Sequence, residues 1–282
     1  MTSTADTDLV AQARRSWGAL ETLHVVGYFS PVVAQQYVDL GLHKRLAYFA
    51  VRSAAFGRAP AELTIATFYV FAPWLVRKAL PASWDIVSPE KIQQARREGV
   101  AAALDQALGS PDVAEALELA KTACEGLSYA GRPLYAAHST LAWPDDDLLA
   151  LWHAATLLRE HRGDGHIAVL LKAGLDPVES LILGGVFSNN TEFVRTTRGW
   201  SDEEWAAGEQ RLVLRGLIDG ADLTEEGRAF RQQIEDDTDE LAAEGWAHLG
   251  LEGTTRLYEL VSPLRKQVLA SGTLPDWISR RG

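Results

Sequence analysis

Residues 201–230 read SDEEWAAGEQRLVLRGLIDGADLTEEGRAF, and this stretch decides the fold. Ser201 and Glu204 form an S-x-x-E capping box, which predicts a helix that begins at the next residue. Gly216 ends that helix, and the Asp-Gly pair that follows predicts the turn of a short β-hairpin. Thr224 then caps another helix. The stretch therefore predicts a helix, a hairpin and a second helix, in that order.

The rest of the chain also favours helices, because the same capping chemistry recurs. Asp176 and Glu179 bracket a proline in a D-P-x-E helix start, and Ser88 precedes a similar start at Pro89. Gly174 marks a helix end. We expect a mainly α protein whose only β structure is the hairpin.

The predicted order over residues 147–245 resembles the winged-helix domain of MarR-type proteins. Leu223, Thr224, Gly227 and Arg228 match the family's motif between the wing and the next helix. The resemblance implies that residues 202–215 occupy the position of the DNA-reading helix and that the hairpin, about residues 217–223, is the wing.

Over its whole length the chain also resembles actinobacterial proteins of about 280 residues, which carry the label "helix-turn-helix family protein". The label describes a fold and implies no activity. The stretches that carry this resemblance are LHVVGYFSP (23–31), ALPASWDIVSPE (79–90), AGRPLYAAH (130–138), LWHAATLLREHRGDGHIAVL (151–170) and GWSDEEWAAGEQRLVLRGLI (199–218).

The length of 282 residues is enough for two domains, each with its own core. We expect an N-terminal helical domain over 1–140 and a C-terminal winged-helix domain with a helical tail over 141–282. The order of features in 59–100 is similar to that in 176–217, so the N-terminal domain is either a degenerate helix-turn-helix repeat or a single all-α unit.

Composition favours a globular protein of the cytoplasm. Apolar residues make up 47% and charged residues 23%, and the single cysteine, Cys124, excludes an internal disulfide and a cysteine-rich zinc site. No apolar run approaches the roughly 20 residues that span a bilayer. We therefore expect no membrane partner and a cytoplasmic location.

The distribution of charge disfavours DNA recognition by the predicted winged helix. Residues 201–244 hold fourteen acidic and four basic side chains, a balance of −10 out of the chain's net charge of −11. Asp202, Glu203 and Glu204 occupy the first turn of the predicted reading helix, where phosphates would be repelled. These acids also favour the helix dipole, which is a purely structural role. We expect no nucleic-acid partner.

A second notable stretch is LLREHRGDGHIAVL, residues 157–170. Two glycines and six ionisable side chains interrupt apolar helical sequence, so we expect one helix over about 146–161 and a second from Gly165 to Gly174. Asp164 would cap the second helix. The exposed N-terminus of that second helix, beside Arg159 and Arg162, is a natural site for an anion.

These features give the candidate site residues. Arg159, Arg162 and Asp164 would hold the polar end of a ligand in a cavity between the domains. The remaining ligand-binding candidates are aromatic or imidazole side chains, of which Tyr135 and His138 lie just before the second domain: His24, Tyr28, Trp74, Tyr135, His138 and His153. The candidates for acid–base catalysis are Glu160, His161 and His166. The alternative is that all of these groups pair internally and only fix the fold.

The sequence therefore predicts a protein that binds a small, partly aromatic, anionic molecule on a winged-helix scaffold, with a role in natural-product binding or resistance. The alternatives are an enzyme that acts on such a molecule through residues 159–166 and a DNA-binding regulator. A second copy of the chain is a further expected partner. The cofactor is unknown, and a metal on His153, His161 and His166 is disfavoured because their spacing matches no established ligand pattern.

Overall fold

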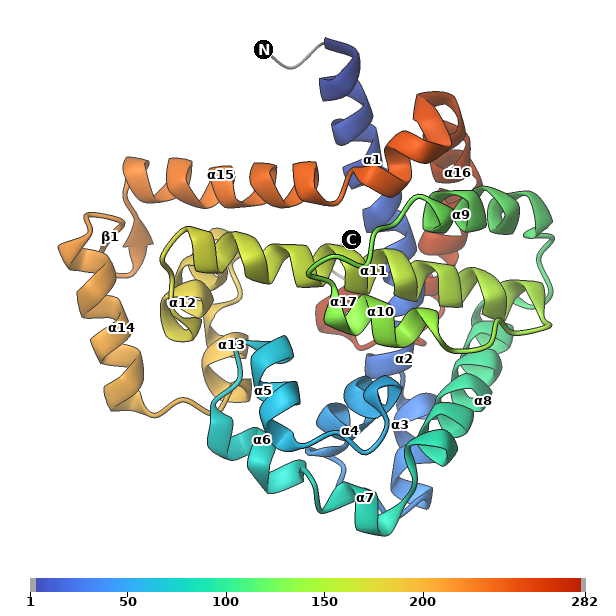
Figure 1. Cartoon of the computed structure of the whole chain (residues 1–282), viewed down its shortest axis with the longest axis horizontal. Helices are drawn as coiled ribbons and strands as arrows, with labels where there is room; N and C mark the ends of the chain where they lie inside the picture. Colours follow the sequence, from blue (N-terminus) through green and yellow to red (C-terminus); the bar gives the residue numbers. More distant parts are fainter. Residues whose placement is uncertain (1–3, 280–282) are drawn as a thin grey trace.

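The computed structural model describes residues 4–279, and these fold almost entirely into helices (Figure 1). The elements of the first half are α1 (Thr4–His24), α2 (Val26–Phe29), α3 (Pro31–Asp39), α4 (Ala47–Ser53), the 3₁₀ helix η1 (Ala54–Phe56), α5 (Ala61–Phe68), α6 (Pro73–Ala79), α7 (Ser83–Ile86), α8 (Pro89–Leu108), α9 (Ala114–Glu125) and α10 (Pro133–Ser139). Those of the second half are α11 (Asp147–Lys172), α12 (Pro177–Phe187), α13 (Thr191–Thr197), α14 (Asp202–Leu214), β1 (Ile218–Asp219), β2 (Asp222–Leu223), α15 (Glu225–Leu241), α16 (Glu244–Ala270) and α17 (Asp276–Ser279). The prediction of a mainly α protein with one short hairpin is confirmed.

The helix starts that the sequence predicts are confirmed by their caps. Asp176 and Ser201 each form a complete capping box, with Glu179 and Glu204 as the reciprocal partners. The Thr224 hydroxyl accepts a hydrogen bond from the Gly227 N–H at the start of α15. Each cap satisfies backbone donors that a helix end leaves unpaired.

The wing is a two-stranded antiparallel hairpin in which Ile218 pairs with Leu223. The turn lies at Gly220 and Ala221, one residue later than the predicted Asp219-Gly220 pair, because Asp219 pairs with Asp222 in the hairpin. Gly220 has φ of 58°, a conformation that suits glycine. Gly227, just after the wing, is required by a close approach, because a Cβ there would lie 1.8 Å from the carbonyl oxygen of Leu217. The wing and α15 can pack together only with glycine at that position.

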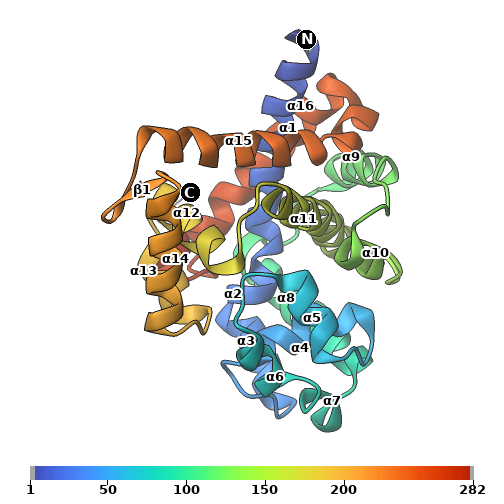
Figure 2. The same ribbon diagram turned by 60° about the vertical axis from the view of Figure 1, so that its left-hand side comes forward.

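Buried apolar side chains form two clusters. One draws on residues between 13 and 158 and on α16 and Leu274, and the other on residues 169–234. Helix α11 contributes to both, and Figure 2 shows α12, α13 and α14 gathered on one side of it, with α3 to α7 below. The division at residue 140 and the repeat within the N-terminal half stay predictions.

The predicted break in the helix at residues 162–165 is wrong. Helix α11 runs without interruption from Asp147 to Lys172, so the expected corner and second helix do not exist. Asp164 caps a different helix: its Oδ2 accepts hydrogen bonds from the backbone N–H groups of Leu134 and Tyr135 at the start of α10, at 2.9 and 3.0 Å. Packing of the neighbouring helices outweighs the weak helix propensity of the two glycines.

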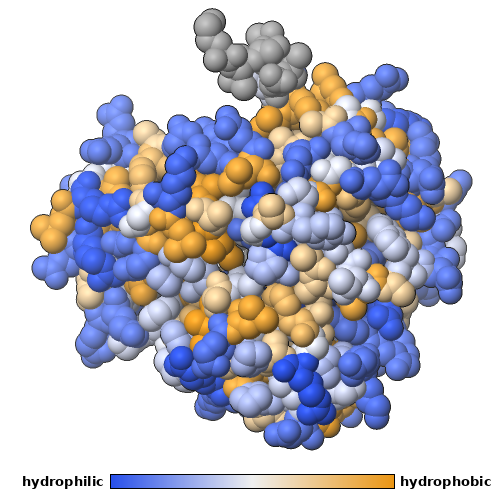
Figure 3. All heavy atoms as spheres, in the orientation of Figure 1, coloured by the Kyte–Doolittle hydropathy of each residue, from blue (hydrophilic) through white to orange (hydrophobic). Residues whose placement is uncertain are grey.

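The surface is largely hydrophilic on the face shown in Figure 3, with smaller hydrophobic patches between charged side chains. Over residues 4–279, no helix is long and apolar enough to cross a membrane. The cytoplasmic location stays a prediction.

Candidate functional site

A cavity of about 220 Å³ lies where the two apolar clusters meet. We call it the arginine cavity. Its polar wall comes from α4, α11, α12 and α15, and consists of Arg52, Arg159, His166, Ser180 and Arg231. Its apolar wall consists of Phe68, Tyr69, Val70, Ile167, Leu170 and Leu175. Two glycines, Gly163 and Gly184, complete the lining. The cavity therefore combines guanidinium groups with an apolar, partly aromatic surface.

One side of the polar wall is organised by Glu160, whose side chain is fully buried. Its carboxylate accepts four hydrogen bonds: from Arg52 Nη2 at 2.7 Å and Nε at 3.2 Å, from Arg159 Nη1 at 2.8 Å and from the Tyr28 hydroxyl at 3.1 Å. Burial raises its pKa, but Arg159 and Arg52 more than offset this and hold the pKa well below its usual range. Glu160 is therefore ionised, and a single carboxylate serves two guanidinium groups.

Arg159 has a second acidic neighbour, because Glu21 Oε1 lies 3.7 Å from its Nε. Burial raises the pKa of Glu21 to about 7, against the lowering effect of Arg159. At neutral pH Glu21 therefore carries only part of a negative charge. This carboxyl group neutralises Arg159 incompletely.

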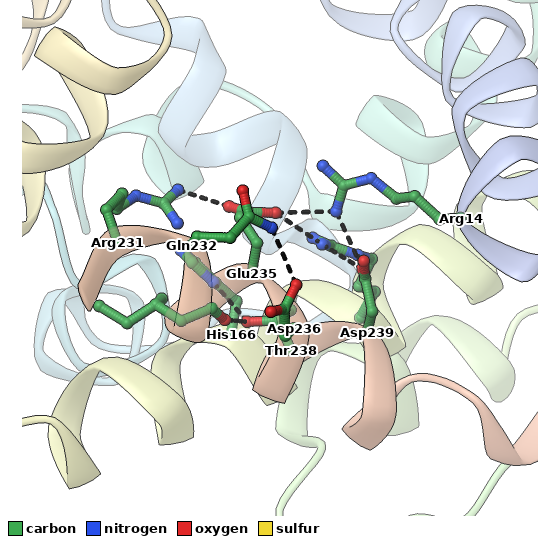
Figure 4. Close-up of polar contacts among 10 residues, drawn as sticks. Arg14, His166, Arg231, Gln232, Glu235, Asp236, Thr238 and Asp239 are labelled. Atoms are coloured by element: carbon green, nitrogen blue, oxygen red, sulfur yellow. Dashed lines mark hydrogen bonds and ion pairs between the residues drawn. The ribbon is translucent and has the colours of Figure 1, made fainter. Parts of the chain in front are cut away.

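The opposite side of the polar wall belongs to a network on α15 (Figure 4). Arg231 donates to Glu235, and Arg14 donates to the same carboxylate at 2.8 Å and to Asp239 at 2.9 Å. Arg162 binds both acids, at 3.1 Å and 2.7 Å. Burial raises the pKa of Glu235, but Arg231 and Arg14 lower it to about 2. Here three guanidinium groups share two carboxylates.

Arg231 is the most exceptional member of the lining. Its residue is only 8% exposed, and its Nη1 is buried with no hydrogen-bond partner among residues 4–279. A buried donor without a partner costs about 1–3 kcal/mol, and more when it carries charge. Arg231 is therefore held by Glu235 on one side only, and its second terminal nitrogen is unsatisfied within the described part of the chain.

His166 lines the cavity beside Arg231, and its Nδ1 lies 2.9 Å from the Thr238 hydroxyl (Figure 4). That hydroxyl donates its own proton to the carbonyl oxygen of Ile234 at 2.6 Å, so Nδ1 must carry the hydrogen of the neutral ring. Burial lowers the pKa of His166 to about 4. At neutral pH Nε2 is therefore free of a proton and can accept a hydrogen bond.

The apolar wall contains a strained turn. The Val70 N–H donates to the carbonyl oxygen of Phe68 at 2.6 Å, and Tyr69 between them has φ of 51° and ψ of −61°. This is the rare form of the γ-turn, and such strain persists only where the surroundings hold it. The Tyr69 hydroxyl fixes the turn by donating to the carbonyl oxygen of Leu175.

Only two of the residues that the sequence singled out line the arginine cavity, namely Arg159 and His166. Arg162 and Glu160 lie in the ion-pair networks behind it, and Tyr28 contacts Glu160. Asp164 caps α10, as described above.

The other predicted residues lie in different surroundings. His161 Nε2 is 2.6 Å from Glu244, and the His161 ring packs edge-on against Tyr135. Burial lowers the pKa of His161 to about 4, that of His153 to about 4 and that of His138 to about 3. His24 bonds Thr156 in the first apolar cluster. Trp74 is exposed at a separate groove.

Sequence reasoning missed Arg52, Arg231, Ser180 and Gly184 as parts of this site. Arg231 stands four residues before Glu235, a spacing typical of surface ion pairs on helices. Arg52 meets Glu160, its partner, 108 residues further along the chain. Nothing local in the sequence could indicate that either side chain faces a cavity.

The basic side chains at the end of α14 are both engaged with neighbouring groups. Arg211 pairs with Asp176 and Glu179, and Arg215 donates to the carbonyl oxygens of Gly174 and Ala173. Both arginines are thus engaged within their own half of the molecule. The acids at the start of α14, Asp202, Glu203 and Glu204, remain exposed.

The donor sets also bear on metal binding. Among the described residues, no group of three or more histidine, cysteine, aspartate or glutamate side chains is placed to hold a metal ion. His153, His161 and His166 each have separate partners: the ring of Trp143, the carboxylate of Glu244 and the hydroxyl of Thr238.

Comparison with known proteins gives one match. A family model described as "Helix-turn-helix family" matches residues 13–275. No curated protein and no solved structure matches the chain.

Proposed function

Because the chain belongs to the helix-turn-helix family, we propose that its winged helix serves as the scaffold of a small-molecule binding protein and does not read DNA. The ligand is a small anion with an aromatic part. It occupies the arginine cavity, with its anionic group at Arg231 and Arg159 and its ring against Phe68 and Tyr69.

The observation that carries this proposal is the excess of buried guanidinium groups around one cavity. Arg231 has a buried donor without a partner, and Arg52 and Arg159 share Glu160. Buried charges are normally paired, and guanidinium groups bind carboxylate and phosphate in a fixed bidentate geometry. An anionic ligand would restore the balance of charge.

The apolar wall supports an aromatic part for this ligand. Phe68 and the γ-turn at Tyr69 form one side, and the guanidinium of Arg52 lies 4.5 Å from the centre of the Phe68 ring. The volume of about 220 Å³ lies below the roughly 300–1,000 Å³ of pockets that hold drug-sized ligands, which favours a single ring over a large molecule. Aromatic carboxylates, including natural products that carry one, have this chemistry.

The charge distribution supports the part of the proposal that excludes DNA. In the MarR-type winged helix that the sequence resembles, α14 would enter the major groove. Its two arginines are tied to neighbouring groups. Of the three exposed acids at its start, Asp202 pairs with Arg195 at 2.8 Å, while Glu203 and Glu204 would face phosphates. The alternative of an enzyme has less support, because of Glu160, His161 and His166 only His166 lines the cavity.

The proposal is tested by isothermal titration of the protein with benzoate and with 1- and 2-naphthoate. Arg231→Gln is the test variant, and Arg228→Gln, three residues earlier on α15 and exposed, is its matched control. We expect at least one of these anions to bind. Arg231→Gln should lower the affinity for that anion tenfold or more, while Arg228→Gln should leave the affinity unchanged. Equal binding by the two variants, or no binding of any of the anions to the unaltered protein, would overturn the proposal.

A further inference from the structure

A second and larger hollow, of about 730 Å³, lies between the loop after α3, helix α6 and the end of α13. We call it the Trp74 groove. It shares no lining residue with the arginine cavity, so the two sites can be tested independently. The polar side chains that line it are His43, Arg45, Lys78, Thr196 and Thr197. No carboxylate is among its lining residues, although the chain as a whole carries a net charge of −11.

The two permanent cations of the groove are available to a ligand. Arg45 and Lys78 are exposed, and neither side chain forms an ion pair within residues 4–279. Arg77, next to Lys78 on α6, differs in that its Nε pairs with Glu62 at 3.2 Å. The groove therefore presents two positive charges that no protein acid neutralises.

Trp74 gives the groove an aromatic face that is fixed in place. The residue is 55% exposed, yet its indole Nε1 donates to the carbonyl oxygen of Gly199 at 2.7 Å. Gly199 has φ of 83°, and a Cβ there would lie 3.3 Å from the Trp74 ring and 3.0 Å from Leu75. The absence of a side chain at Gly199 thus lets the ring lie close to the backbone and keeps it oriented.

From this arrangement we propose that the Trp74 groove binds a nucleotide, with the base stacked on Trp74 and the phosphate at Arg45 and Lys78. A planar ring stacks on an exposed indole, and a phosphate prefers paired cations to a single one. The threonine hydroxyls at the end of α13 already donate to backbone carbonyls and so add acceptor oxygens rather than donors. Affinity for phosphate therefore depends on the two cations.

The volume and the number of exposed rings favour one nucleotide over a duplex. The groove is of the size that pockets for small ligands have, and its lining includes one large aromatic side chain, Trp74, besides the imidazole of His43. The nucleotide is either free or the terminal nucleotide of a single strand, since both present a base and a phosphate.

The test is a titration at low ionic strength with AMP, ATP, inorganic phosphate and a 5′-phosphorylated single-stranded dodecamer, without added metal. We expect ATP to bind at least tenfold more tightly than phosphate. Trp74→Leu and Lys78→Gln should each lower the affinity for ATP tenfold or more. Arg77 is the adjacent cation and is already paired, so Arg77→Gln should change the affinity for ATP less than twofold. If the dodecamer binds more tightly than AMP and its affinity also depends on Trp74, the natural ligand is the terminal nucleotide of a single strand. If AMP binds more tightly than the dodecamer, the ligand is a free nucleotide.

Two results would overturn the assignment. One is the absence of binding by every probe with a base. The other is an ATP affinity that falls equally in Lys78→Gln and Arg77→Gln, or that is unchanged in Trp74→Leu. Such binding would depend on the overall charge of the protein and not on the Trp74 groove. Circular dichroism of each variant establishes that it is folded, and Arg231→Gln should bind ATP normally, which separates this site from the arginine cavity.

Discussion

Gly163 offers the sharpest perturbation of the arginine cavity, because alanine at this position should make the protein more stable and a poorer binder at once. The glycine lies in the interior of α11, where it costs roughly 0.5–1 kcal/mol relative to alanine. Packing does not require it. A Cβ would lie 3.8 Å from Arg159 Nη1, 3.8 Å from Glu160 Oε2 and 4.0 Å from Arg52 Nη2, all ordinary contact distances.

We therefore expect Gly163→Ala to raise the free energy of unfolding by about 0.5–1 kcal/mol, which is roughly 1–4 °C in melting temperature for a protein of this size. The same methyl group would occupy space at the cavity wall beside Arg159 and Arg52. Crowding of a packed site costs about 1–3 kcal/mol, so affinity for an aromatic carboxylate should fall roughly tenfold.

The assay pairs urea denaturation with calorimetric titration of the same preparation. Gly165→Ala is the matched control, two residues along the same helix. A Cβ there would lie 2.9 Å from Arg132 Nη1, so the guanidinium would lose its contacts with His161 and with the Leu241 carbonyl, and stability should fall. The reasoning is refuted if Gly163→Ala is less stable than the unaltered protein, or if it binds the ligand with unchanged affinity.

Three further predictions concern a buried ion pair, a buried neutral histidine and duplex DNA. Glu160→Gln should lower the free energy of unfolding by about 3–5 kcal/mol, because it leaves Arg52 and Arg159 buried without their shared carboxylate; a loss below about 1 kcal/mol in urea denaturation would contradict this. Acid should destabilise the protein below about pH 6.5: burial lowers the pKa of His138 to about 3, so the unfolded chain binds a proton that the folded chain excludes, and this histidine alone costs about 2 kcal/mol at pH 5. Urea denaturation of His138→Leu at pH 7 and pH 5 should show a decrease in the free energy of unfolding that is about 2 kcal/mol smaller than in the unaltered protein. An equal decrease in the two proteins would contradict this role of His138. Mobility-shift assays in low salt should detect no binding to duplex DNA, whereas salt-dependent binding that survives Trp74→Leu would restore DNA recognition as a function.

The winged helix could be predicted from the sequence because the interactions that define it are local. Ser201 and Glu204 bond each other across one helical turn, and Thr224 reaches only to Gly227. The hairpin depends on a turn of two residues. Each of these signals can be read within a few residues of the chain, and the structure confirms them.

Helix α11 could not be predicted correctly because distant residues determine it. Asp164 finds its donors 29 and 30 residues away at the start of α10, and the Arg132 guanidinium packs over Gly165. Arg162 reaches acids more than 70 residues later on α15. Local propensity favoured a break, and contacts of this kind outweigh it.

The candidate site was predicted only in part for the same reason. Arg159 and His166 were identified because charge is unusual in an apolar helix, and both line the cavity. The sequences around Arg52 and Arg231 show no feature that distinguishes them from other helices. Only the tertiary arrangement of α4, α11 and α15 brings the two side chains to the arginine cavity.

A crystal structure of the protein grown with an aromatic carboxylate such as benzoate would show whether the arginine cavity binds an anion. We expect the carboxylate within hydrogen-bond distance of Arg231 Nη1, with its ring against Phe68 and Tyr69. A carboxylate bound only outside the arginine cavity, or a cavity filled by a rearranged protein side chain, would contradict it.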